Sequence, residues 1–264
     1  MSLPSTGLIK LNDLKQQLGS GPGSVVYMSQ YYQDGLGSGL CNIPNRGNLI
    51  TLGMFRGLSA SYITNGLIAF FDPGNSNSYI GSGANIKSLV GSNITGTLAG
   101  TFTYSSSNGG SIRLLNNNSD RLSNRSYLTL PMINSISTLS LWYRLNGVFA
   151  TPSYFLDARD GAANGWMHNE DLGLTWSNAV MRVNGGSNVG LNKTTLTSIF
   201  TSNVWRNVTL SPSSPVSDDI TMFARYSLDE GVDIAFGQIM MYNRQLSEGE
   251  NQRNYNFFRS RYGL

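Results

Sequence analysis

The acidic side chains of this sequence are too few and too poorly spaced for paired-carboxylate catalysis. Glutamate occurs only at positions 170, 230, 248 and 250. Two of these glutamates stand next to an aspartate, as Glu170 with Asp171 and Asp229 with Glu230. Adjacent residues of a strand point to opposite faces, so neither pair could flank one glycosidic bond. We interpret both pairs as loop charges and expect a protein that is not an enzyme.

The single histidine and the single cysteine do not indicate a nucleophilic site. His168 has no Gly-x-Ser-x-Gly turn to present a serine to it, although a Ser-His-Asp triad built from distant positions stays open. A lone loop histidine is more often a hydrogen-bonded surface residue. Cys41 has no basic neighbour to activate it and is expected to pack as a small hydrophobe. One cysteine also excludes an intramolecular disulfide and a cysteine-based zinc site.

The charge pattern argues against nucleic acid and membranes as partners. Charged residues make up 12% of the chain, which is about half the usual share. The formal charge is +3, but the arginines are scattered singly instead of forming a basic patch. No apolar run approaches the ~18 residues of a membrane span, and the N-terminus lacks the regions of a signal peptide. We expect synthesis in a reducing cytoplasm, with no nucleic-acid and no membrane partner.

Residues 1–60 form a degenerate internal repeat, which predicts an extended docking segment. Three short apolar-alternating stretches, at 8–11, 25–28 and 49–52, are each followed by a bulky apolar residue and separated by Gly/Ser-rich connectors. Such units have too little apolar surface to fold alone, so we expect them to become ordered by packing against a partner. The residues expected to dock are Leu11, Leu14, Tyr27, Tyr31, Leu52 and Phe55.

From about residue 61 to residue 264, turn-punctuated strands predict one all-β domain. The expected strands are 66–72, 96–104, 111–115, 127–130, 137–145, 153–158, 172–176, 179–183, 195–200, 204–210, 220–227 and 233–242. Alternation is clearest in 139–145, where one face is apolar throughout. Many short strands without βαβ alternation favour an antiparallel sandwich or barrel.

One short helix is expected at the C-terminus. Ser247 and Glu250 fit a capping box, with the serine at the N-cap and the glutamate three residues later. Tyr255, Phe258 and Tyr262 then follow at helical spacing, and Gly263 can end the helix.

Several segments together resemble the concanavalin A-like, LamG-type jelly-roll domains of viral proteins. They are 66–75, 78–79, 81–83, 96–98, 103–105, 108–112, 141–143, 204–210 and 237–247. Trp142 and Trp205 are similar to the family's two inner-sheet tryptophans, and 237–247 with the following helix is similar to its closing signature. The Trp-x-Asp-Leu-Ser that commonly follows the first loop is replaced here by residues 86–90. The resemblance implies a concanavalin A-like antiparallel β-sandwich.

The N-terminal repeat resembles a second element, found at the start of tail, fibre and minor capsid proteins of tailed phages and large DNA viruses. Residues 4–14 and 53–57 carry it. Both resemblances on one chain imply a virion structural protein, located in the particle and docked through residues 1–60 to other capsid or tail proteins. Strand addition at a partner's edge suits such a segment. A carbohydrate-binding adhesin for host-surface glycans is the alternative, and a homo-oligomer is compatible with both.

Two groups of residues are candidates for ligand contacts in the sandwich. LamG-like domains often hold calcium, and the resemblance makes Asp157 and Asp160 candidate ligands, although their spacing matches no defined loop and no other cofactor is expected. Trp166 and Trp176, with Asn and Asp nearby, suit stacking on a sugar ring. The competing interpretation is that both tryptophans fill the sandwich core beside Trp142 and Trp205.

Overall fold

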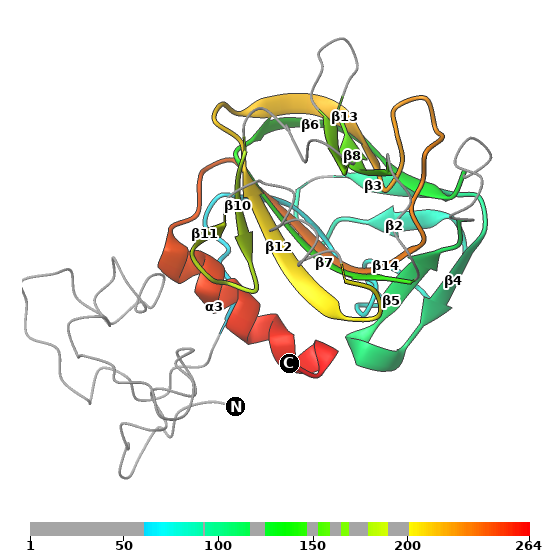
Figure 1. The fold of residues 1–264 in the computed structure, drawn as a ribbon, viewed down its shortest axis with the longest axis horizontal. Coiled ribbons are helices and arrows are strands. Elements are labelled where there is room, and N and C mark those ends of the chain that lie inside the picture. The colour runs from blue at the N-terminus through cyan, green and yellow to red at the C-terminus, as the bar shows by residue number, and fades with distance from the viewer. Residues whose placement is uncertain are drawn as a thin grey trace, which may run out of the picture. The chain divides into compact units, whose positions relative to one another are not determined.

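The computed structural model describes residues 61–91, 93–116, 125–146, 153–158, 165–168, 179–189 and 201–264 (Figure 1). The six docking residues expected in 1–60 lie outside this part of the chain, as do Asp160 and Trp176. Two units are distinguished, Gly66–Gln245 and a unit that combines residues up to Asn65 with Leu246–Leu264. No helix of the described residues has the length and apolar character needed to span a bilayer.

The Gly66–Gln245 unit is an antiparallel β-sandwich, which confirms the predicted jelly-roll class. Its larger sheet has the order β11-β10-β12-β7-β14-β5-β4, with β1 also paired to β14. The strands of this sheet are β1 (Leu67–Phe71), β4 (Phe102–Ser105), β5 (Ser111–Leu114), β7 (Thr138–Leu145), β10 (Val180–Val183), β11 (Asn188–Val189), β12 (Trp205–Ser211) and β14 (Ile234–Tyr242). A short 3₁₀ turn, η3 (Ser107–Gly109), precedes β5.

The smaller sheet is the second layer of the sandwich (Figure 1). Its order is β2-β3-β6-β13-β8-β9. The strands are β2 (Asn85–Lys87), β3 (Thr95–Ala99), β6 (Tyr127–Ile136), β8 (Ser153–Asp157), β9 (Gly165–His168) and β13 (Val216–Met222). β2, β9 and β11 were not expected from the sequence. The expected strands 172–176 and 195–200 fall outside the described residues.

Alternation along the strands fills the core between the two sheets. On β7, Leu139, Leu141, Tyr143 and Leu145 belong to the core cluster. The Tyr143 ring meets the Phe155 ring of β8 edge-on, with 5.2 Å between centroids. Replacing one such buried leucine with alanine costs about 2–5 kcal/mol of folding free energy.

Trp142 and Trp205 are both buried, as expected, but they lie outside the cluster of side chains between the two sheets. Trp142 alternates with Leu141 and Tyr143 on β7, so it points to the other face of the larger sheet. In register, Trp142 faces Asn207 and Trp205 faces Arg144.

The expected strand 96–104 is two strands in different sheets. β3 belongs to the smaller sheet and β4 to the larger one, and the chain turns between them at Gly100. Gly100 has φ +74°, and a Cβ there would lie 2.4 Å from the carbonyl oxygen of Arg125. The expected strands 127–130 and 220–227 are also shifted, to β6 (Tyr127–Ile136) and β13 (Val216–Met222).

The predicted C-terminal helix is confirmed as α3 (Glu248–Phe258), followed by the 3₁₀ turn η5 (Arg259–Tyr262). The Glu250 N–H donates to Ser247 Oγ at 3.3 Å, and the Ser247 N–H donates to Glu250 Oε2 at 2.9 Å. Gly263 ends η5 in the left-handed conformation. Within the same unit, Arg253 Nε donates to the Ser61 carbonyl and the Ile63 N–H donates to Asn254 Oδ1, each at 2.8 Å.

Comparison of two glycine substitutions tests whether the turn at Gly100 depends on close packing. We expect Gly83→Ala to cost about 1–2 kcal/mol of unfolding free energy, because its φ of +84° strains any L-residue but the space is open. Gly100→Ala adds steric overlap with backbone atoms, so its loss should be larger by about 1–3 kcal/mol. Urea denaturation of both variants measures the difference, and equal losses would contradict the steric argument.

Candidate functional site

Asp157, a predicted calcium ligand, is the last residue of β8. Its side chain is fully buried, and Oδ2 accepts the Tyr226 N–H at 2.9 Å. A carboxylate held in this way fixes the segment after β13. Among the described residues there is no group of three or more His, Cys, Asp or Glu side chains that could hold a metal ion. Asp160 lies outside the described residues, so the calcium site stays a prediction.

The predicted stacking of Trp166 and Trp176 on a sugar ring is not tested by the described part of the chain. Trp166 lies in β9, the edge strand of the smaller sheet, where its backbone pairs with Leu156. Trp176 falls outside the described residues. Both remain predictions.

The acidic pair Asp229–Glu230 has local partners that fit its interpretation as loop charge. Asp229 Oδ1 accepts a hydrogen bond from Ser227 Oγ. Glu230 Oε1 lies 4.0 Å from Arg225 Nη1. The two carboxylates therefore serve different neighbours instead of converging on one site.

A hydrogen-bonded loop after β1 builds the hollow that we take as the candidate site. Asp72 Oδ1 accepts the Gly74 N–H at 2.9 Å, and the Asp72 carbonyl accepts the Asn75 N–H at 3.0 Å. These bonds form an Asx-type turn, for which aspartate is suited. Gln238 Nε2 of β14 also donates to Asp72 Oδ1, at 3.4 Å. The carboxylate thus ties the loop start to the centre of the larger sheet.

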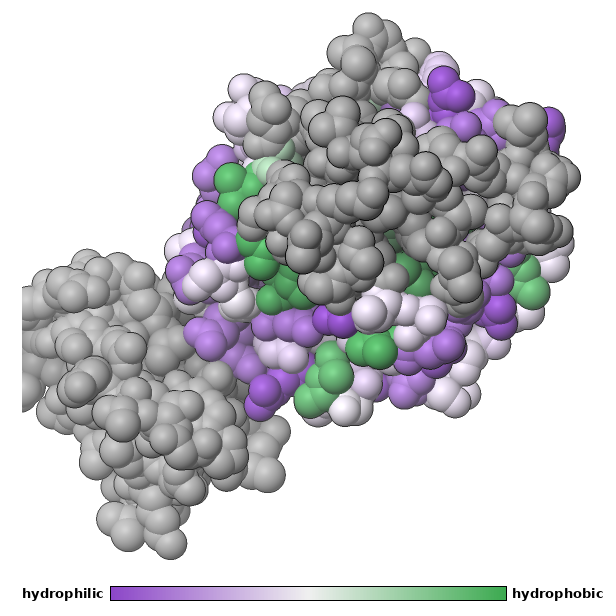
Figure 2. All heavy atoms as spheres, in the orientation of Figure 1, coloured by the Kyte–Doolittle hydropathy of each residue, from purple (hydrophilic) through white to green (hydrophobic). Residues whose placement is uncertain are grey.

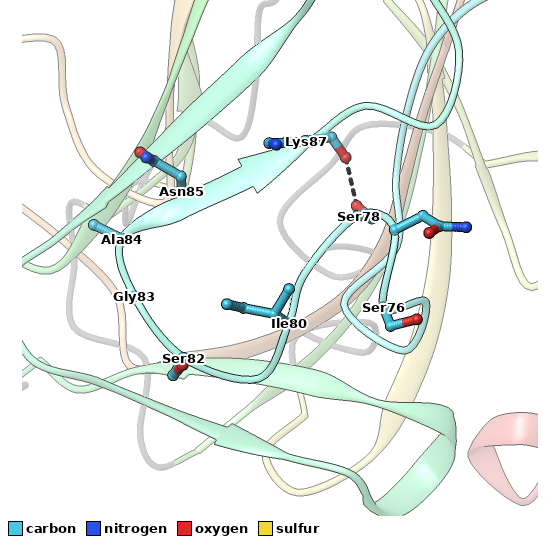
Figure 3. Close-up of a pocket in the computed structure, with 9 residues that line it drawn as sticks. Ser76, Ser78, Ile80, Ser82, Gly83, Ala84, Asn85 and Lys87 are labelled. Atoms are coloured by element: carbon cyan, nitrogen blue, oxygen red, sulfur yellow. Dashed lines mark hydrogen bonds between the residues drawn. The ribbon is translucent and has the colours of Figure 1, made fainter.

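Ser78 clamps the loop to β2. Its Oγ accepts the Asp72 N–H at 3.0 Å and donates to the Lys87 carbonyl at 2.5 Å (Figure 3). The Lys87 N–H donates to the Ser78 carbonyl at 2.8 Å. One small buried hydroxyl therefore joins three segments of the loop, and this explains why a serine stands there.

Tyr79 closes the far side of the loop. Its ring is buried, its hydroxyl donates to the Gly83 carbonyl at 2.9 Å, and the Tyr104 ring lies 5.6 Å away. Burial, and secondarily Tyr104, raises the pKa of Tyr79 above its ordinary value. The phenol therefore stays protonated and keeps donating this hydrogen bond.

Gly110 packs onto Gly74 at the start of the same loop. The approach is so close that a Cβ at Gly110 would lie 2.2 Å from the Gly74 Cα.

The loop and β2 enclose a hollow of about 450 Å³ (Figure 3). Its lining is composed of hydroxyl, amide and ammonium groups together with one aliphatic side chain. The residues with these groups are Ser76, Asn77, Ser82, Asn85, Lys87 and Ile80. All six are exposed, and Ile80 is 80% exposed, an unusual position for an isoleucine. The lining holds no carboxylate, histidine or cysteine, so this arrangement suits binding and not acid–base chemistry.

The segment that departs from the family pattern supports this loop by other contacts. Ile86 is buried in the core, and Ser88 Oγ accepts the Phe70 N–H at 2.9 Å. The Leu89 N–H donates to the Phe70 carbonyl at 2.7 Å. Sequence reasoning did not identify the hollow. Its one available signal was Ile80, an isolated aliphatic residue within a Ser/Gly-rich stretch.

The comparisons with known proteins give only distant likenesses. No family model matches the chain, and no curated protein matches it. Among solved structures it is similar to Trypanosoma rangeli sialidase in complex with 2,3-difluorosialic acid, with 11% identity and a TM-score of 0.47 over 76% of this chain and 34% of that one. It is also similar to the binding domain of Paraclostridial Mosquitocidal Protein 1, with 13% identity and a TM-score of 0.49 over 74% and 52%.

A third similar structure is the receptor binding domain of botulinum neurotoxin C/D mosaic serotype. The identity is 11% and the TM-score 0.49, over 74% of this chain and 52% of that one. The chain thus spans about a third to a half of the length of these proteins. At such identities and TM-scores, the likeness carries no conclusion about function.

Two serine-to-alanine substitutions test whether the Ser78 hydroxyl holds the loop against β2. Ser78→Ala removes the acceptor of the Asp72 N–H and should lower the free energy of unfolding by about 1–3 kcal/mol. Ser76→Ala, at an exposed position of the same loop, should change it by no more than about 0.5 kcal/mol. Urea denaturation followed by fluorescence measures both, and equal stabilities would show that the Ser78 hydroxyl is not a structural clamp.

Proposed function

We propose that the sandwich is a non-catalytic carbohydrate-binding module and that the hollow beside β2 receives the sugar. The observation that carries this proposal is the exposed Ile80 among hydroxyl, amide and ammonium groups in a hollow of about 450 Å³. Small-ligand sites typically have volumes of about 300–1,000 Å³ and combine apolar area with a few polar groups.

The lining offers what a sugar ring requires. Asn77 and Asn85 each carry an amide that both donates and accepts, and Ser76 and Ser82 carry hydroxyls that do the same. Sugar hydroxyls need partners of both kinds. The apolar C–H face of a sugar can then pack against the Ile80 side chain, which the fold leaves exposed. A ligand bound here meets no carboxylate that could cleave it.

An isoleucine-to-alanine exchange tests the sugar contact. A glycan array, read with calcium and with a chelator, first identifies a ligand, and calorimetry then measures its affinity. We expect Ile80→Ala to weaken binding about tenfold, because it removes most of the aliphatic contact. Met132→Ala is the matched control, since Met132 is another exposed aliphatic residue, 55% exposed, on β6. A wild-type protein that binds no glycan, or an unchanged affinity in Ile80→Ala, would contradict the proposal.

We further propose that the protein is a structural component of a virus particle, located in the virion after synthesis in the host cytoplasm. The three repeat units of residues 1–60 and their resemblance to virion-protein N-termini support this role. Their apolar residues would pack on a capsid or tail partner, with strand addition as the mode of contact. Such a protein can display a sugar-binding sandwich to a host surface, so the two roles are compatible.

Deletion of residues 1–60 tests the virion role. We expect the shortened protein to fold, because the sandwich core contains residues 66–245, and to be absent from purified particles. The measurement is the amount of the protein in gradient-purified particles, and Ile80→Ala in the full chain serves as the control that keeps the docking segment. Normal incorporation of the shortened protein would overturn this role.

A further inference from the structure

The outward face of the larger sheet carries a row of arginine and aromatic side chains across four adjacent strands. Arg113 of β5 is in register with Ala235 of β14, Ala235 with Arg144 of β7, and Arg144 with Trp205 of β12. Directly opposed residues of antiparallel strands share one face. Strands lie about 4.8 Å apart, so the row spans roughly 14 Å. Ala235, the smallest member, is itself buried between the two arginines.

The first arginine of this row is already paired within the chain. Arg113 Nε donates to Asp233 Oδ1 and Nη2 donates to Asp233 Oδ2, both at 2.9 Å. This hydrogen bonding raises the pKa of Arg113, with burial opposing it. The pair is a two-point guanidinium–carboxylate contact, the geometry that makes arginine selective for planar oxyanions.

Arg144 carries the same guanidinium group, but it forms no such contact with a carboxylate in the described part of the chain. Its Nε atom is buried, and no hydrogen-bond acceptor lies against it within the described part of the chain. Arg144 takes part in neither the Arg113–Asp233 ion pair nor the Arg225–Glu230 ion pair. A buried donor left unpaired is costly, so natural structures seldom retain one without a reason. The guanidinium is nevertheless held in place, because its carbon lies 5.7 Å from the centre of the Trp205 ring.

The exposed segment before β12 lies beside the end of β7. Ser202 forms a bridge with Leu145, and the Asn203 N–H donates to the Leu145 carbonyl at 2.7 Å. Both Ser202 and Asn203 are exposed. The Asn146 N–H donates to the Asp233 carbonyl at 3.0 Å, which ties this strand end to β14. A guanidinium without a carboxylate partner among the described residues, near the exposed Asn203 amide, matches a ligand with an acidic group next to a hydroxyl.

We propose that Arg144 binds the carboxylate or sulfate group of an acidic saccharide. Trp205 holds the guanidinium in position, and the exposed Asn203 receives a neighbouring sugar hydroxyl. A polyanion such as nucleic acid would require a row of unpaired cations, whereas Arg113 of this row is already paired with Asp233. An Asp/Glu-rich peptide is the competing ligand class. This site is distinct from the hollow beside β2, and its occupancy does not require a ligand there.

Calorimetry with matched neutral and acidic oligosaccharides tests the site. The probes are a galacturonic acid hexamer, its fully methyl-esterified form and a sulfated heparin tetrasaccharide, which separate carboxylate from sulfate recognition. We expect the full-length protein to bind at least one acidic probe at least tenfold more tightly than the neutral ester, which is the effect of one charge-assisted hydrogen-bonded contact. Arg144→Gln should abolish that preference, and Arg144→Lys should retain part of it.

Two controls isolate Arg144 from general charge and from the other site. Arg225→Gln removes an arginine that already faces Glu230 and should leave the preference unchanged, as should Ile80→Ala. A thermal melt of each variant checks folding, and Arg144→Lys keeps the test valid if Arg144→Gln does not fold. Equal affinity for the acidic and neutral probes, no binding of either, or a preference that survives in Arg144→Gln would overturn the proposal. Tighter binding of an Asp/Glu-rich peptide than of any saccharide would overturn it in favour of a protein partner.

Discussion

The two-residue alternation of the central strands β7, β12 and β14 is the constraint on which the sandwich depends. On β7, one set of side chains fills the core and the other set, including Trp142 and Arg144, lies on the outward face. A one-residue shift in register would exchange the two sets and place Arg144 in the core. The aromatic contact between Tyr143 and Phe155 across the two sheets therefore also fixes where the outward row of arginines stands.

The elements with strong local patterns were predictable from sequence. The capping box at Ser247 and Glu250 is encoded within four residues, so the helix began where expected. Strand β7 was predicted because the alternation of its apolar residues is contained within the single segment 139–145. The turn at Gly100 was not predicted, because its need for glycine arises from the backbone of Arg125, which is distant in sequence.

The candidate sites depend on contacts that sequence patterns do not report. Alternation in 139–145 puts Trp142 on the face opposite to Leu141 and Tyr143, whereas the family resemblance led to its assignment to the core. The hollow beside β2 requires Ser78 to join Asp72 and Lys87, and no periodicity encodes that junction. Arg144 and Arg113 lie 31 positions apart in the chain (144 − 113), and only the pairing of each with Ala235 brings them onto one row.

The loop beside β2 separates residues that hold its backbone from residues that line the hollow. Asp72, Ser78 and Tyr79 fix the chain path with buried hydrogen bonds, whereas Ile80 and Ser82 contribute exposed side chains to the hollow. Substitutions at the second group alter the ligand surface with little cost to folding. In the proposed sugar site, ligand preference can therefore diverge among related chains while the loop itself is retained, because the two properties depend on different side chains.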